Sequence, residues 1–231
     1  MQSLDLLPLQ LAAAAGSVND LATSRLVAAG FTLLQRSVPV VRALSRKRSA
    51  ILLSDPTQLL TALAASDGRG ALLLNPGADR SAIAAQLTAA NVGAVFTTEP
   101  LQPSLPAGTV CVLLDDAPTT ARVVVSDREP QRIDLGSHFG LELTGDPEAD
   151  GRDEECLALC ADNSTTSPVV ATYTHRDLIA RARASAAAAQ LKSGEPVFFL
   201  ARGPIWEIDA LIAEFLAPLI AGCRVTTRGT S

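Results

Sequence analysis

Short apolar runs alternate with longer segments of helical period, and this alternation constrains the fold more than any other feature of the chain. The runs are SAILLS (49–54), ALLLN (71–75), AVFTT (94–98) and TVCVLL (109–114). PTQLLTALAAS follows the first run and DRSAIAAQLTAAN the second. Continuous apolar strands separated by about 10 to 15 helical residues are typical of a parallel sheet with helices on both faces. We therefore predict an α/β fold built from parallel βαβ units.

The same pattern resumes after a turn-rich stretch that ends in the acidic run DPEADGRDEE (146–155). The predicted later strands are CLALCA, VVATYT, VFFLA and CRVTT, with helices predicted over 175–192 and 205–221. Four segments follow: an N-terminal helical segment (1–48, broken before Pro39), a first α/β unit (49–116), a strand plus solvated acidic linker (117–155) and a second α/β unit (156–231).

Length, composition and charge exclude several classes of protein. A chain of 231 residues that is 48% hydrophobic can bury one large core or two small ones. The net charge of −5 argues against a nucleic-acid partner, because such binding depends on lysine and arginine. Every long apolar stretch is interrupted by charged residues, and Met1 to Gly16 has no basic start. We expect a soluble, intracellular, cytoplasmic protein without a transmembrane segment.

One region departs from the acidic balance of the chain. Between Leu21 and Leu53 there are six basic residues and no acidic one. A solvated helix face explains this most simply. A phospholipid surface, a contact surface in an assembly or part of a mitochondrial address also fits and stays open.

The cysteines and histidines do not predict a metal site. Cys156 and Cys160 lie four residues apart in a predicted strand, which separates their sulfurs by roughly 13 Å, too far for a disulfide or a shared ion. His138 and His175 stand in no metal-ligand spacing. We predict structural cysteines and no bound metal.

The stretch DNSTTSPVVATYTH (162–175) leads from a loop through a strand into a helix. Thr174 is placed to cap the helix, and Asp177 three residues later completes a capping box. This arrangement predicts His175 as an exposed residue of the first helical turn.

The order of these elements resembles the N-terminal half of the acyl-adenylate-forming family, the AMP-dependent synthetases and ligases that include acyl-CoA synthetases and peptide-synthetase adenylation domains. Residues 46–99 resemble the family's opening strand and helix units, VCVLLDD the strand that follows, and APLIAG (217–222) a helix end of the form PLxxG. The resemblance covers about residues 20 to 116 and 156 to 227. It implies parallel-sheet βαβ units like the N-terminal subdomains of those enzymes.

The resemblance also assigns the loop. The family's phosphate-binding signature is T-S-G-T-T-G-x-P-K-G followed by S/T-H, and an ungapped alignment sets residues 161–170 against it. Ser164, Thr165, Pro168, Thr174 and His175 match or nearly match this signature. The resemblance implies nucleotide binding, in degenerate form, at Ser164, Thr165, Thr166, Pro168 and His175. Asn163, Thr166 and Val170 stand where glycine is expected, and Val169 replaces the lysine. Asp162 adds a negative charge of its own. We interpret the loop as degenerate.

The residues that bind phosphate and catalyse adenylation in the family are the basis for our functional prediction. Glycines let backbone N–H groups approach a phosphate, and a lysine neutralises it. The later Tyr-Gly-x-Thr-Glu motif, the ribose-binding aspartate and the C-terminal lysine of the family are not in this sequence. We predict a shortened, catalytically inactive relative with no catalytic residue and no cofactor, retained as a structural or protein-interaction subunit that has a partner or self-associates. A non-catalytic binder of an acyl, CoA or nucleotide ligand, or one piece of a split acyl-CoA synthetase, remains the alternative.

Overall fold

The computed structural model of the chain describes residues 6–44, 47–66, 70–106, 109–115, 119–126, 128–136, 154–160, 170–199 and 205–227.

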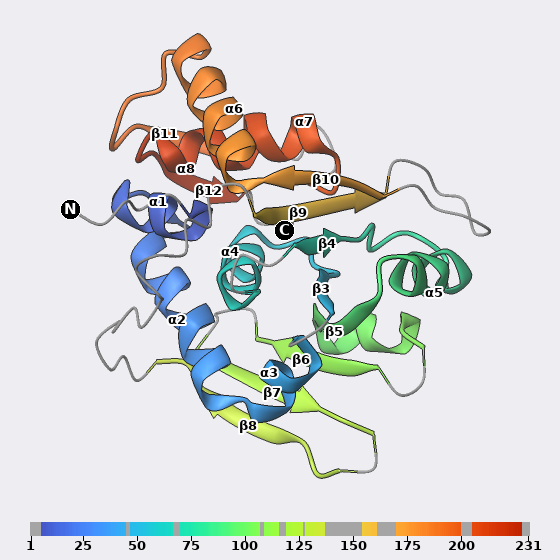
Figure 1. The fold of residues 1–231 in the computed structure, drawn as a ribbon. Coiled ribbons are helices and arrows are strands. Elements are labelled where there is room, and N and C mark those ends of the chain that lie inside the picture. The colour runs from blue at the N-terminus through green and yellow to red at the C-terminus, as the bar shows by residue number, and fades with distance from the viewer. Residues whose placement is uncertain are drawn as a thin grey trace.

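The larger of two sheets has eight strands in the order β10-β9-β4-β3-β5-β6-β7-β8 (Figure 1). Its strands are β3 (Arg48–Ile51), β4 (Ala71–Leu73), β5 (Val92–Thr97), β6 (Val110–Leu114), β7 (Thr120–Val124), β8 (Gln131–Asp134), β9 (Glu155–Cys160) and β10 (Val170–Thr174). The strands from β9 through β4, β3 and β5 to β6 run parallel. The pairs β9–β10, β6–β7 and β7–β8 run antiparallel.

The prediction of a parallel sheet is therefore correct for the middle of the sheet and wrong for its two margins. β6, β7 and β8 follow one another through connections of five and six residues. A parallel crossover needs about a dozen residues or more, so connections this short force an antiparallel meander. β8 itself was not predicted, because only Ile133 of its four residues is buried and its sequence lacks an apolar run.

Helices cover both faces of this sheet, as predicted. Alternate residues of β3 and the residues just after it divide between the faces: Ile51 and Leu53 belong to one apolar core, and Ala50 and Leu52 to another. α4 (Pro56–Ala65) packs on the first face and α5 (Arg80–Ala89) on the second. η1 (Glu99–Ser104) follows β5. Because successive side chains of a strand point to opposite faces, β3 and the residues just after it contribute to both cores.

A second layer of helix lies over α4. α2 (Thr23–Arg36) crosses it so closely that a Cβ on Gly30 would stand 2.4 Å from the carbonyl oxygen of Thr61. α1 (Leu7–Ala13) packs on α2, and α3 (Val38–Leu44) follows α2 after a break at Ser37. The predicted interruption before Pro39 is confirmed: Ser37 leaves the helical region with φ −116° and ψ 88°, and Pro39 lies in the first turn of α3, where a missing backbone N–H is tolerated.

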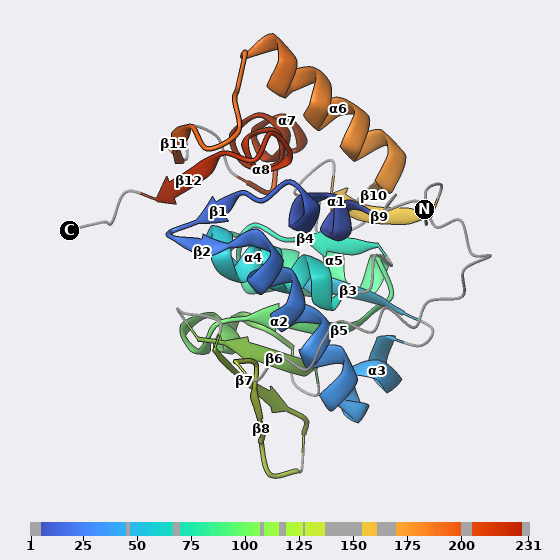
Figure 2. The same ribbon diagram turned by 90° about the vertical axis from the view of Figure 1, so that its left-hand side faces the viewer.

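The second sheet has four strands in the order β11-β12-β1-β2, drawn together in Figure 2. Its strands are β1 (Ser17–Val18), β2 (Leu21–Ala22), β11 (Pro196–Phe199) and β12 (Arg224–Thr227). β1 and β2 were not predicted; they lie inside the segment expected to be helical. Asn19 and Asp20 both have positive φ, at 48° and 65°, as a two-residue turn between antiparallel strands requires.

The C-terminal helices pack on one another, and the last of them contacts β12 of this second sheet. α6 (His175–Ala188) is followed, after β11, by a helical stretch made of α7 (Ile208–Ala210), the π-helical η3 (Leu211–Leu216) and α8 (Ala217–Ile220). The single helix predicted over 205–221 is therefore a composite. Pro218 has no backbone N–H to complete an α-helical turn, which accounts for the wider turns before it.

The sheets do not follow the four predicted segments. β9 and β10 of the predicted second unit complete the larger sheet, whereas β11 and β12 pair with β1 from the N-terminal segment. Glu155, expected at the end of the acidic linker, is the first residue of β9. The boundaries at 48, 116 and 155 stay predictions about domain organisation.

Candidate functional site

The candidate site is the edge of the larger sheet at which β3, β4, β5 and β9 all end. Ile51 is level with Leu73 on one side and with Phe96 on the other, and Leu73 is level with Leu159. Because these strands are parallel, the segments that follow them leave the sheet together. We call this edge the carboxyl edge; in open α/β sheets it is where ligands bind.

The predicted phosphate-binding loop starts from the carboxyl edge. β9 ends there at Cys160, and β10 pairs with β9 in antiparallel register, with Val170 opposite Cys160 and Ala171 opposite Leu159. Residues 161–169 therefore connect two strands whose ends are fixed. Four of the predicted nucleotide-binding residues, Ser164, Thr165, Thr166 and Pro168, lie outside the described residues.

The prediction that His175 is exposed is wrong. Its side chain is fully buried, and its Nδ1 accepts a hydrogen bond from the backbone N–H of Leu7 at 2.9 Å. The reason is tertiary: α1 packs against the start of α6 and covers this first-turn position. An accepting Nδ1 carries no proton, so the imidazole can keep only its Nε2 proton. The histidine thus holds the first turn of α1; its assignment to nucleotide binding stays a prediction.

The capping box ahead of His175 is confirmed. The Thr174 hydroxyl accepts from the backbone N–H of Asp177 at 3.1 Å, and the Thr174 N–H donates to the Asp177 carboxylate at 3.4 Å. Both side chains are used to start α6. The ring of Tyr173, one residue earlier, lies 5.4 Å from the guanidinium of Arg181 in a cation–π contact.

The carboxylates near the carboxyl edge are engaged in helix capping. Asp55 accepts from the backbone N–H groups of Thr57 and Gln58 and from the Thr57 hydroxyl at the start of α4. Asp79 caps α5, and the Ser81 hydroxyl, followed by the Ala82 N–H, lowers the pKa of its carboxyl. The lowered pKa of the Asp79 carboxyl makes that group a weaker general base.

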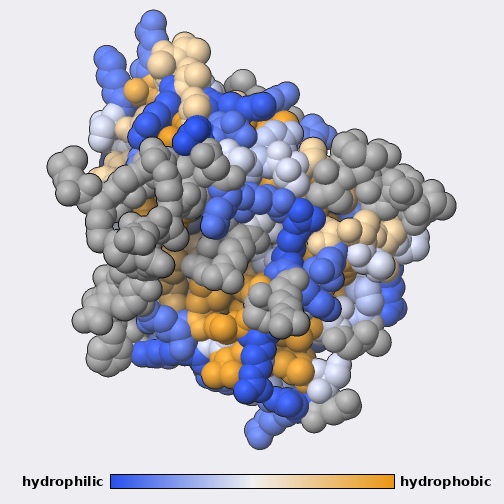
Figure 3. Space-filling model, viewed as in Figure 1, coloured by the Kyte–Doolittle hydropathy of each residue, from blue (hydrophilic) through white to orange (hydrophobic). Residues whose placement is uncertain are grey.

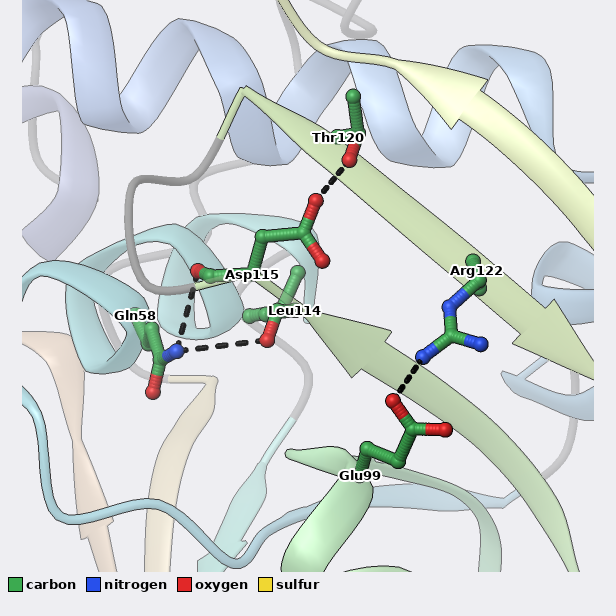
Figure 4. A network of polar contacts seen from close by, with 6 residues as sticks. All are labelled: Gln58, Glu99, Leu114, Asp115, Thr120 and Arg122. Atoms are coloured by element: carbon green, nitrogen blue, oxygen red, sulfur yellow. Dashed lines mark hydrogen bonds and ion pairs between the residues drawn. The ribbon is translucent and has the colours of Figure 1, made fainter.

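A glutamine joins this edge to β6, in a contact that sequence reasoning missed. Figure 4 shows Gln58 of α4 donating from Nε2 to the carbonyl oxygens of Leu114 at 3.3 Å and Asp115 at 3.0 Å. In the same view Asp115 accepts from Thr120. The sequence did hold a signal: Gln58 is the one strongly polar side chain inside the apolar helix PTQLLTALAA, and it is buried.

One polar atom at the carboxyl edge has no partner among the described residues. Thr97, the last residue of β5, is fully buried, and its Oγ1 makes no hydrogen bond. A buried hydroxyl without a partner costs about 1 to 3 kcal/mol, so such an atom is uncommon and calls for an explanation, such as an ordered water or a bound ion. Thr97 is therefore a candidate residue of this edge for contact with a bound group.

Three of the four cysteines are buried, as expected for structural cysteines. Cys111, Cys156 and Cys223 are buried, and burial raises the pKa of each thiol; Cys160 is half-buried. None forms a disulfide. Within the described part of the chain, no three histidine, cysteine, aspartate or glutamate side chains gather where they could hold a metal ion. No described helix is both long and apolar enough to cross a lipid bilayer.

No protein family matches this sequence, and no curated protein is similar to it in sequence. Solved structures do match its fold. The N-terminal domain of FACL13 from Mycobacterium tuberculosis has a TM-score of 0.68 and 15% identity, over 98% of this chain and 57% of that one. ATP-bound MatB from Rhodopseudomonas palustris has a TM-score of 0.69 and 14% identity, over 96% and 44%.

A third match is the O-succinylbenzoate coenzyme A synthetase MenE from Bacillus subtilis in complex with AMP, with a TM-score of 0.65 and 17% identity over 98% of this chain and 55% of that one. The chain thus spans about half the length of these three proteins. The predicted resemblance is confirmed at the level of the fold: this chain has the fold of the N-terminal part of AMP-dependent synthetases.

Proposed function

We propose that this chain is a non-catalytic module with the fold of the N-terminal part of acyl-CoA synthetases, and that it works as a structural or protein-interaction subunit of a larger assembly. The observation that carries the proposal is the sequence of the loop between β9 and β10. Its two ends are fixed at the carboxyl edge by the pairing of Cys160 with Val170. Its residues lack the glycines and the lysine that a phosphate needs.

The cost of those replacements is large. β-Branched residues such as Thr166 and Val170 resist the positive φ that glycine provides, so the backbone N–H groups lose their approach to an anion. Val169 supplies no charge, and Asp162 supplies the wrong one. A carboxylate about 4 Å from one phosphate charge costs roughly 4 kcal/mol at an effective dielectric constant of 20, which weakens binding about a thousandfold.

The surfaces that the chain exposes support an interaction role. β11 is an edge strand of the second sheet, and Phe198 in it is 59% exposed. Edge strands offer unpaired backbone groups, and an exposed aromatic side chain beside them favours association. Both features suit a subunit whose second sheet is continued by another polypeptide.

The first test is a ligand screen. Thermal unfolding of the chain with Mg-ATP, AMP, CoA and a fatty acid should give the same transition as the protein alone. A ligand at 100 times its dissociation constant would add about 2.7 kcal/mol to the free energy of unfolding, which such a screen detects. The variant D162S/N163G/T166G/V169K/V170G removes the Asp162 charge, restores the expected glycines and lysine, and serves as the gain-of-function arm. Stabilisation of the wild-type chain by ATP would overturn the non-catalytic part of the proposal.

The second test is association. Light scattering after size exclusion, followed by affinity capture from the native extract, should give a defined oligomer or a fixed set of partner subunits. F198S should weaken that association without changing thermal stability, because the side chain is mostly solvated in the isolated chain. A monomer that captures nothing would contradict the interaction role.

A second candidate function rests on Thr97. A fold that retains the carboxyl edge could bind an acyl, CoA or nucleotide ligand without reacting it, and the Thr97 hydroxyl is the buried group without a partner there. In that case the screen would detect one ligand, and Thr97→Val, which removes the hydroxyl at nearly constant volume, would abolish its effect. In the absence of a ligand the same variant should be neutral or stabilising.

A further inference from the structure

Helix α3 presents an apolar face to solvent although it is anchored to the core on its other side. Val40 and Leu44, four residues apart, are buried, whereas Val38 and Val41 are 60% and 49% exposed. Residues 38, 41 and 42 recur at helical spacing and share one side of the helix. Figure 3 shows hydrophobic surface gathered over this part of the molecule. A solvated helix would carry polar side chains there.

The position of α3 is firmly set. α3 packs on β5, and a Cβ on Gly93 would stand 2.0 Å from the carbonyl oxygen of Ala43. Backbone contact this close leaves no room for the helix to turn its valines inward. The exposed face is therefore a fixed feature of the surface.

Positive charge surrounds this face. Arg42 is exposed on the same side as Val38 and Val41, and Lys47 is exposed just beyond the helix. The elements that pack most closely on α3 are α2, β5 and β6, and none of them contains an aspartate or glutamate. The described elements that pack most closely on α3 thus add no negative charge beside Arg42 and Lys47, on a chain whose net charge is −5.

We propose that the α3 face, defined by Val38, Val41, Arg42 and Lys47, docks on an anionic lipid surface. Amphipathic helices lie in the interfacial plane of a bilayer when their apolar side chains enter it and lysine or arginine lies beside them. Each cation near an anionic leaflet contributes about 1 kcal/mol, or roughly fivefold in partitioning. The two half-exposed valines contribute about tenfold together when buried. The result is peripheral, reversible attachment that depends on both kinds of residue.

Vesicle flotation of the full chain tests the proposal. The wild type should float with vesicles of phosphatidylcholine and phosphatidylserine in a ratio of about 70 to 30, and not with phosphatidylcholine alone. V38S/V41S should lower the partition coefficient about tenfold and R42Q/K47Q about 25-fold. About 0.5 M salt should release the wild type, because it shortens the screening length.

A matched control comes from the other end of the molecule, where Figures 1 and 2 place α6 far from α3. Arg176 is an exposed arginine on α6. R176Q should float like the wild type, and circular dichroism should show that all variants are folded.

Three outcomes would overturn the proposal. In the first, the wild type does not float with the anionic vesicles. In the second, V38S/V41S floats like the wild type, which would mean that binding depends on charge alone and not on the α3 face. In the third, the chain does not float, light scattering shows that it self-associates, and V38S/V41S abolishes this self-association. That result would mean that the α3 face binds a second copy of the chain.

Discussion

Arg48 and Glu155, the first residues of β3 and β9, form a bidentate ion pair. The Nε–Oε1 and Nη2–Oε2 distances are both 2.6 Å, and the two side chains are 30% and 28% exposed. β4 lies between the strands they come from, so the pair spans a neighbouring strand. The Gly70 N–H, just before β4, donates to the Glu155 carbonyl at 2.7 Å. The contact joins residues 107 positions apart and fixes β9 to the first βαβ unit.

The first prediction concerns this ion pair. R48M and E155Q should each destabilise the chain, and a double-mutant cycle from urea unfolding should give a coupling energy of about 1 kcal/mol. Because both side chains are partly exposed, this coupling energy lies near the upper end of the range for surface ion pairs and below the values for buried ones. The coupling should shrink in about 0.5 M salt. A coupling energy near zero would mean that β9 is held by its strand pairing alone.

The second prediction concerns the α2–α4 contact at Gly30. Alanine is the better helix former by about 1 kcal/mol, so propensity alone predicts that Gly30→Ala stabilises. The added Cβ would instead stand 2.4 Å from the Thr61 carbonyl oxygen and 2.6 Å from the Ala64 Cβ. We expect a loss of about 2 to 3 kcal/mol in chemical denaturation, because backbone must move to relieve the overlap.

Gln35, exposed on the same helix, provides the control. Q35A should change the free energy of unfolding by no more than a few tenths of a kcal/mol. A stabilised G30A variant would show that α2 and α4 lie further apart than described.

The third prediction isolates the hydrogen bond between Leu7 and His175. H175N places an oxygen near the position of Nδ1, whereas H175L, of similar volume, leaves the Leu7 N–H without an acceptor. We expect H175L to be less stable than H175N by about 1 to 2 kcal/mol. Hydrogen exchange at the Leu7 amide should also be faster in H175L. Equal stability and equal exchange in the two variants would show that Nδ1 does not hold α1.

The fourth prediction concerns Gln58. Gln58→Glu keeps the size of the side chain but points a carboxylate at two carbonyl oxygens. We expect a loss of about 2 to 4 kcal/mol at pH 7, larger than that of Gln58→Met, which only removes the donor.

The pH dependence of the Gln58→Glu variant has a definite sign. The carbonyl oxygens favour the protonated acid, so the pKa of the introduced carboxyl group would be raised in the folded state relative to about 4.3 in the unfolded chain. The deficit relative to wild type should therefore be small at about pH 4 and grow as the pH rises above that value. A pH-independent deficit would indicate that the side chain reaches solvent.

The fifth prediction concerns thiol reactivity. Burial raises the pKa of Cys111, Cys156 and Cys223, so little of each is thiolate at pH 7 and access is blocked. Titration with an aromatic disulfide reagent should show one faster phase from Cys160 and three slow ones. Cys160→Ser should remove the fast phase. Four equally slow thiols would contradict the half-buried position of Cys160.

Local sequence determined much of the fold. The central strands β3 to β6, the helices α4 and α5 and the start of α6 follow from apolar periodicity and from capping residues such as Asp55, Asp79 and Thr174. These signals are local, because a strand buried on both faces must be apolar throughout and an N-cap satisfies backbone groups within one turn. The resemblance in the loop and strands also predicted the fold that the solved structures share.

Tertiary structure decided which distant strands and side chains pair with one another. The short hairpin around Asn19 and Asp20 becomes a strand pair only because β12, about 200 residues later, hydrogen-bonds to it through Ser17 and Val18. His175 is buried because α1 covers it, and Glu155 pairs with Arg48 across the intervening strand β4. Such contacts join distant segments, and their free energy depends on geometry that no local pattern encodes. The sequence by itself determined the central strands and most helices and predicted a degenerate loop; only packing determined the sheet margins, the buried histidine and the exposed face of α3.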